Sequence, residues 1–171
     1  MDAPSRREAI RLLERSRTDL LALIDGLSPR AMNRHAIGRG KWSPKDVVGH
    51  LATWEGFSVE ALVAWDRGRG WHRESELWTR GVDPTNRLEL ERKGKLSAPE
   101  VRRRADATHE ELMSRLRTMS DTRWRKPATP RGRRPLADRL GGILGGPAGP
   151  FRHDEAHLGE LRLFVVEYSP G

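Results

Sequence analysis

The clearest helix start in the chain lies in residues 41–55, which read KWSPKDVVGHLATWE. Ser43 is an N-cap residue, Pro44 stands at the first helical position, and Asp46 stands at the third position of a capping box. Apolar side chains then recur at helical spacing as far as the glycines at 68 and 70. The pattern predicts a long helix with one buried stripe, formed by Val47, His50, Leu51, Trp54, Ala61, Leu62 and Trp65.

Three further stretches repeat the amphipathic pattern, with apolar residues three and four positions apart. They cover residues 6–27, a helix capped by Ser97 that reaches Met119, and residues 151–168. Shorter helices are expected at 83–90 and 136–144, and loops at 123–134 and 145–150. No stretch alternates with a period of two for long enough to predict a strand. The sequence therefore predicts an all-α four-helix bundle, as one domain over 1–171 with a basic, Pro/Gly-rich loop at about 121–150.

The charge of the chain is strongly basic. Its 171 residues include 32 Lys+Arg and 24 Asp+Glu, for a formal net charge of +8. Such an excess raises nucleic acid as a partner, because basic side chains neutralise phosphates. The charge is spread over most segments, however, which favours a solvated surface and no nucleic-acid partner. The alternative is a nucleic-acid-binding module that uses the basic loop, with stacking on Trp124.

Cysteine is absent from the sequence. This excludes disulfide scaffolds, cysteine-ligated zinc, iron–sulfur clusters and a thiol nucleophile on the protein. No segment approaches the ~20 apolar residues of a membrane-spanning helix, and the first residues lack the apolar core of a secretory signal. We therefore expect a cytoplasmic protein with no membrane partner, whose thiol chemistry, if any, comes from a small-molecule thiol.

Three of the six histidines form a candidate metal site. His153 and His157 are four residues apart, so they project from one face of the last predicted helix, and His50 lies on the buried stripe of the second. Three neutral imidazoles from two packed helices can hold a divalent metal such as zinc, nickel or iron and leave a position open for water or substrate. Hydrogen-bonded core histidines are the alternative interpretation.

Two motifs of the chain resemble those of the DinB-like superfamily. Residues 41–55 resemble its second-helix signature, which is Trp-Ser, a short capped start and then His-Leu, and residues 153–157, HDEAH, resemble its last-helix motif. Order and placement agree over roughly residues 5–168. The resemblance implies an up-up-down-down bundle with a metal site at His50, His153 and His157. The helix opening and residues 83–86, DPTN, look closest to the ClbS/DfsB branch.

The resemblance also implies a function. The superfamily includes bacillithiol- and mycothiol-dependent transferases and the metal-binding domain of mycothiol-dependent maleylpyruvate isomerase. We therefore expect a metal-binding enzyme that acts on an electrophilic small molecule, as a hydrolase or as a transferase that uses a low-molecular-weight thiol such as mycothiol. The alternative is a ClbS-like, metal-independent self-resistance protein that hydrolyses or sequesters a reactive, DNA-damaging natural product, for example one that bears a cyclopropane. Dimers are common among such bundles, so a homodimer is a candidate assembly.

Three residues near the histidines are further candidates. Glu160 lies three residues after His157, where it is a possible fourth ligand or catalytic base, although a solvated helix flank also explains it. Tyr168 lies on the same face as His157 and is a candidate ligand-pocket residue, with core packing as the alternative and its hydroxyl expected at the end of the bundle. Asp46 lies one turn before His50, but its capping role already accounts for it.

Four tryptophans are candidates for a ligand pocket. Trp54 and Trp65 are eleven residues apart and so share a helix stripe. Their flat faces suit an aromatic or polyketide-like ligand, with ordinary core packing as the alternative. Trp71 and Trp78 fall in a predicted polar loop, where they are candidates for the rim of a pocket.

Overall fold

Four long helices form a bundle in the computed structural model, which describes residues 3–38 and 41–168. They are α1 (Arg6–Ile24), α3 (Pro44–Asp66), α6 (Ala98–Thr118) and α9 (Glu155–Tyr168). Shorter helices connect them: α2 (Pro29–Met32), α4 (His72–Arg80), α5 (Val82–Gly94), α7 (Asp121–Arg125) and α8 (Leu136–Ile143). Within the described ranges there are isolated β-bridges and no strand, which confirms the all-α prediction. No described helix is long and apolar enough to cross a membrane.

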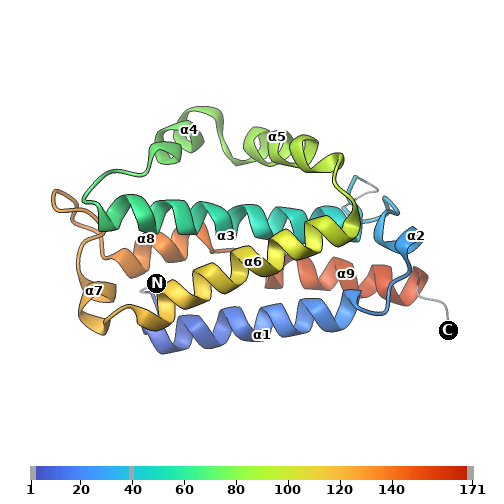
Figure 1. Cartoon of the computed structure of the whole chain (residues 1–171), viewed down its shortest axis with the longest axis horizontal. Helices are drawn as coiled ribbons and strands as arrows, with labels where there is room; N and C mark the ends of the chain where they lie inside the picture. The colour runs from blue at the N-terminus through green and yellow to red at the C-terminus, as the bar shows by residue number, and fades with distance from the viewer. Residues whose placement is uncertain (1–2, 39–40, 169–171) are drawn as a thin grey trace.

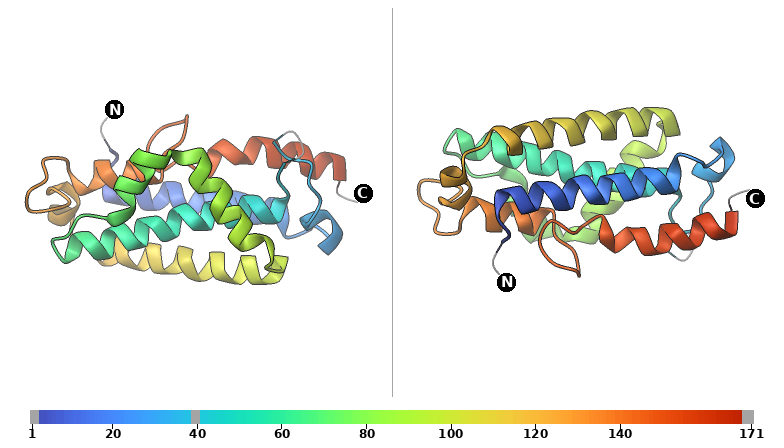
Figure 2. Two further views of the ribbon diagram at one scale, coloured as in Figure 1. Left: turned by 90° about the horizontal axis from the view of Figure 1, so that it is seen from above. Right: turned by 90° about the horizontal axis from the view of Figure 1, so that it is seen from below.

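The directions of the long helices differ from the predicted up-up-down-down order. Figure 1 shows α1 and α9 running toward one end of the bundle while α3 and α6 run toward the other, so the chain order is up-down-down-up. The reason is the crossover over residues 67–97, which carries the chain back along α3 before α6 begins. Figure 2 shows the crossover helices α4 and α5 lying across α3 in the view from above.

Capping boxes begin the two parallel helices, where the sequence predicted the box at Ser43 and a cap at Ser97. The Ser43 hydroxyl accepts a hydrogen bond from the Asp46 N–H at 3.2 Å, and Asp46 Oδ2 accepts from the Ser43 N–H at 2.9 Å. Ser97 and Glu100 form the same pair at the start of α6. Each box satisfies two backbone donors that a helix start leaves unpaired, which explains why these two boundaries were predictable to the residue.

The predicted polar loop after residue 70 is wrong, because His72–Arg80 form α4. Trp71 precedes this helix and is buried, with 5% of its surface exposed, and Leu77 packs against the same apolar cluster. The burial of these two side chains gives α4 a packed face that the polar composition conceals. The side chain of Trp78 lies outside the described part of the chain. The short helix predicted at 83–90 is longer, as α5.

The last helix begins at Glu155, four residues later than predicted. The Gly/Pro break at 145–150 is present, and the turn after it contains Phe151 with a φ of 59°. This left-handed conformation does not occur within a right-handed helix, so the helix cannot begin before it. The Phe151 ring is buried and anchors the turn in the core. As a result His153 lies in this turn and not on the last helix.

The predicted loop at 123–134 is also partly helical, because α7 includes its first three residues. Trp124 on α7 is 3% exposed, and its indole N–H donates to the Pro4 carbonyl at 3.0 Å. The nucleic-acid alternative requires an exposed aromatic face on this stretch. A buried Trp124 does not offer one.

Two clusters of buried apolar side chains fill the bundle, one toward each end. Trp54 and Trp65 belong to the first cluster, and Val47 and Leu51 belong to the second. His50 lies on α3 between them and is itself buried. The fold therefore places a polar ring at the junction of two apolar clusters.

Candidate metal centre

Three imidazoles meet at the junction of the two clusters: His50 from α3, His153 from the turn and His157 from α9. Their candidate ligand nitrogens all lie within 4.8 Å of one another. The Nε2 atoms of His50 and His153 are 3.1 Å apart. These are the three histidines that the sequence singled out.

The chemistry of this donor set fits a divalent metal. Burial and, to a smaller extent, the neighbouring imidazoles lower the pKa of His50 to about 2 and the pKa of His153 to about 4. Burial also lowers the pKa of His157, while the Glu160 carboxylate raises it. Neutral imidazoles are the form that binds metal, and two nitrogens bound tetrahedrally at ~2.0–2.1 Å are about 3.3 Å apart. The separation of His50 and His153 is close to that value.

The Gly/Pro turn explains how His153 reaches the centre from outside the helix. The His153 N–H donates to the Leu144 carbonyl at 3.1 Å. A Cβ on Gly146 would lie 3.0 Å from the Arg152 carbonyl oxygen and 3.4 Å from the His153 Cα, so the two backbones approach too closely for a side chain. The glycine run is therefore part of the support for this ligand.

Trp42 is a part of the centre that sequence reasoning missed. Its ring stacks on His157, with centroids 5.7 Å apart and an interplanar angle of 16°, and it meets His50 edge-on at 4.7 Å. Trp54 lies on the other side, 6.5 Å from His50 and 5.8 Å from His153. Trp42 is part of the quoted Trp-Ser motif, so the signal was present but no role was drawn from it.

Lys93 is a second residue that sequence reasoning missed. From α5 it donates to the Gly49 carbonyl at 2.7 Å and to the Thr53 hydroxyl, which flank His50 on α3. Burial lowers the pKa of Lys93. This contact ties the crossover to the segment of α3 that carries His50.

A buried charged cluster lies behind the turn and was not predicted. His109 Nδ1 on α6 lies 2.6 Å from Glu55 Oε1 on α3. Burial and, to a smaller extent, the charge of Glu55 raise the pKa of Asp154, next to His153, to about 7. Arg17 on α1 is also buried and pairs with Asp106. The cluster connects three long helices to the turn beside the histidines.

Glu160 and Tyr168 lie apart from the three imidazoles. Glu160 is exposed on α9 and is not a member of the ligand group, although its charge acts on His157. Its role as a base remains a prediction. Tyr168 packs on Phe164, with ring centroids 4.8 Å apart, and under the Arg34 guanidinium at 4.0 Å. Its position is at the end of the bundle, as expected, but away from the tryptophans.

Trp54, Trp65 and Trp71 come together around one cavity of ≈ 410 Å³, which we call the crossover cavity. Its remaining lining comes from the crossover helices, α8 and the end of the basic loop. Trp54 contacts His50 and His153 with the same ring that lines the cavity. The crossover cavity and the histidine centre therefore share a wall.

Comparison with known proteins identifies a family and a fold. The sequence model of the DinB superfamily matches residues 12–161. No curated protein matches the chain. The solved structure of an uncharacterised protein from Escherichia coli UTI89 aligns with a TM-score of 0.72 at 12% identity, over 99% of this chain and 98% of that chain. At this identity the similarity shows a shared fold.

Proposed function

The chain belongs to the DinB superfamily, and from this premise we propose that it is a metal-dependent enzyme that modifies an electrophilic small molecule. One observation carries the proposal: three imidazoles, one buried and two half-buried and all with lowered pKa values, present nitrogens within 4.8 Å of one another. Placing three such rings edge to face around one point costs free energy unless a ligand binds their nitrogens. A divalent cation is the ligand that suits three neutral nitrogens.

His50, His153 and His157 would hold the ion, which supplies Lewis acidity when bound. The aromatic rings of Trp42 and Trp54 pack against the imidazoles and restrict water around them. Lys93 holds the His50 segment from the crossover side. Glu160 stands exposed beside His157, where a carboxylate can take a proton from an incoming nucleophile.

A thiol nucleophile comes from outside the protein, because the chain has no cysteine, and water is the alternative nucleophile. Two reactions fit: hydrolysis, in which water attacks the electrophile, and transfer, in which a small thiol such as mycothiol attacks it. In either reaction the bond between the electrophilic carbon and its leaving group breaks as the new bond forms, and the proton of the nucleophile passes to Glu160 or solvent and then to the leaving group. Assays with and without the thiol distinguish the hydrolase from the transferase.

The crossover cavity favours a second candidate function. A cavity lined by three tryptophans suits a self-resistance protein of the ClbS/DfsB type, which hydrolyses or sequesters a reactive natural product without metal. The two candidates differ in their response to a chelator. Chelation removes the activity of the metal enzyme and leaves metal-independent protection intact.

The first experiment is elemental analysis of protein purified without an affinity tag. We expect about one zinc, nickel or iron ion per chain, and its loss in His157→Ala. His72→Ala is the matched control, because His72 is exposed at the start of α4. Wild-type protein that stays metal-free after incubation with each of these ions, or a His157→Ala variant that retains the metal, would contradict the proposal.

A further inference from the structure

The crossover cavity has the dimensions and the lining of a small-molecule site. Its volume of ≈ 410 Å³ lies within the range of ~300–1,000 Å³ that ligand sites occupy. Trp54, Trp65 and Trp71 form an aromatic wall, and Glu74, Arg134 and Arg139 supply the charges. The aromatic wall suits a flat apolar ligand, and the charged residues determine which polar group that ligand must also have.

The polar side chains of this lining are mostly hydrogen-bond donors. The indole N–H groups of Trp65 and Trp71 are buried and have no hydrogen-bond partner among the described residues. Glu74 is the carboxylate of the described lining, and it already accepts from Arg139. Unpaired buried donors cost free energy and call for an explanation. The two nitrogens have almost no exposed surface, however, so the groups of the lining that a ligand oxygen can reach are its arginines.

Arg139 is placed to bind an anionic group. Its guanidinium carbon lies 4.7 Å from the centroid of the Trp65 ring, and its side chain is 14% exposed. A guanidinium stacked on an aromatic ring has a fixed plane and five donors that match a carboxylate. Arg134 adds a second positive charge, so two arginines face one glutamate in the lining.

The helix geometry sets the length of the ligand. Trp54 and Trp65 are eleven residues apart on α3, which corresponds to about 16 Å along the axis. An acidic group at Arg139 and Trp65 therefore leaves the far end of an elongated ligand beside Trp54. That ring contacts His50 and His153.

We propose that the crossover cavity binds the substrate and that the substrate is an elongated aromatic molecule with a carboxylate or a similar anionic oxygen group. The inference rests on the proposed function, since it names the substrate class of the same centre. Arg139 and Arg134 hold the acidic end. The aromatic body lies on the tryptophan wall, with its reactive end toward the histidines.

The test compares an acid with its neutral analogue on metal-free, full-length protein kept in chelator. Isothermal titration calorimetry at pH 7.5 measures binding of biphenyl-4-carboxylate and biphenyl-4-carboxamide. We expect the acid to bind at least about 10-fold more tightly than the amide. Arg139→Gln should lower the affinity for the acid about 10-fold and leave that for the amide unchanged, and Arg139→Lys should restore part of the loss.

Arg131→Gln is the matched control, because Arg131 is exposed in the basic loop and does not line the cavity. Equal affinity for acid and amide, no binding of either, or an equal loss in Arg131→Gln would overturn the proposal. Thermal unfolding followed by circular dichroism checks that each variant folds. If Arg139→Gln does not fold, Arg134→Gln removes the second positive charge of the lining and is expected to weaken binding of the acid alone.

A zinc titration of the same protein separates this inference from the proposed function. Binding of the acid without binding of zinc supports the crossover cavity and overturns the metal centre. Binding of zinc without binding of the acid supports the metal centre and overturns the substrate class. The two failures therefore have different signatures.

Discussion

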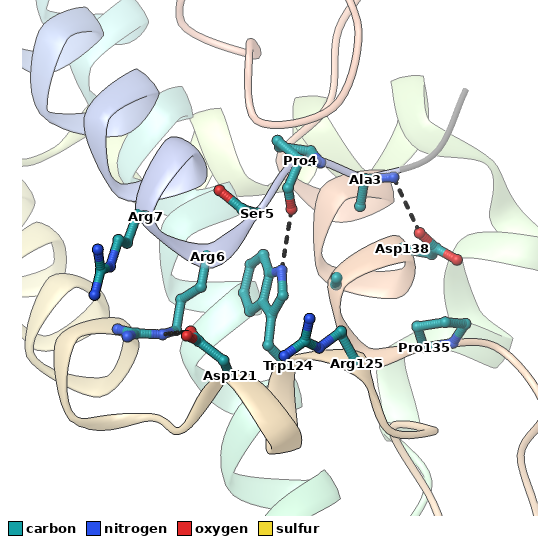
Figure 3. Close-up of a pocket in the computed structure, with 11 residues that line it drawn as sticks. Ala3, Pro4, Ser5, Arg6, Arg7, Asp121, Trp124, Arg125, Pro135 and Asp138 are labelled. Carbon is teal, nitrogen blue, oxygen red and sulfur yellow. Dashed lines mark hydrogen bonds and ion pairs between the residues drawn. The ribbon is translucent and has the colours of Figure 1, made fainter.

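Two of the cavities lined by tryptophan, the N-terminal cavity and the crossover cavity, are similar in size and differ in whether their polar groups have partners. The N-terminal cavity, ≈ 380 Å³, lies between the start of α1, α7 and α8 (Figure 3). There the Trp124 indole donates to the Pro4 carbonyl, the Ala3 N–H donates to Asp138 at 3.2 Å, and Arg6 pairs with Asp121 at 2.8 Å. In the crossover cavity the Trp65 and Trp71 N–H groups have no partner among the described residues.

The difference shows how to distinguish a cavity whose lining holds parts of the chain together from a cavity that binds a ligand. Around the N-terminal cavity Trp124, Arg6 and Asp138 are satisfied within the chain, so these contacts fasten the first residues to α7 and α8. In the crossover cavity the donors outnumber the acceptors, and the histidine centre is adjacent. Volume alone does not distinguish the two, whereas hydrogen-bond satisfaction does.

The largest effect is expected from Trp124→Ala. Trp124 is buried and fastens the N-terminal segment, so its removal should lower the free energy of unfolding by about 3–5 kcal/mol. Urea denaturation at pH 7.5 measures this loss. The folded fraction should bind zinc and the aromatic acid as the wild type does. A Trp124→Ala variant that keeps its stability, or that folds but no longer binds zinc, would contradict a purely structural role for the N-terminal cavity.

A smaller effect is expected from metal binding. Free zinc at 100 times its dissociation constant should raise the free energy of unfolding by about 2.7 kcal/mol over protein kept in chelator. His153→Ala should abolish this gain, because it removes one of the three nitrogens. Trp124→Phe should retain the gain, since its cavity has no part in the centre. Stabilisation by zinc that persists in His153→Ala would place the ion elsewhere.

Acid should destabilise the metal-free protein on the order of 2 kcal/mol between pH 6.5 and 5. The pKa values of His50, His153 and His157 are lowered in the folded state, so below pH 6.5 the unfolded chain takes up protons that the folded chain does not. Stability therefore falls as the pH falls. Asp154 acts in the opposite direction, because its pKa is raised to about 7 and the folded state is the one that binds its proton. Three histidines outweigh one carboxyl.

Urea denaturation at a series of pH values measures this slope. His153→Gln should flatten it, and His72→Gln, at an exposed position, should leave it unchanged. A slope of the opposite sign would mean that the buried carboxyl dominates the histidines.

The smallest effect is the difference between two matched variants, Trp124→Phe and Trp65→Phe. Both remove an indole N–H and similar volume from a buried position. Only Trp124 loses a hydrogen bond, so its variant should be less stable than the Trp65 variant by about 1 kcal/mol. Equal losses measured by urea denaturation would show that the Trp65 N–H is satisfied in solution.

Sequence reasoning succeeded where the signal is local. The caps at Ser43 and Ser97 are local hydrogen-bond patterns, and they marked the starts of α3 and α6 to the residue. Reasoning failed at 71–82 and 151–154, where a buried Trp71 and a buried Phe151 decide the backbone. The local sequence does not indicate which residues from distant parts of the chain will pack against a side chain and bury it.

The sequence by itself determined the helical class, the two capped helix starts, the absence of protein thiols and the identity of the three histidines. These follow from periodicity and composition, which act within a few residues. The tertiary structure alone decided the helix directions, the turn that carries His153, the ring of Trp42 against His157 and the unpaired donors of the crossover cavity. Each depends on contacts between residues far apart in the chain, and such contacts leave no periodic signal in a single sequence.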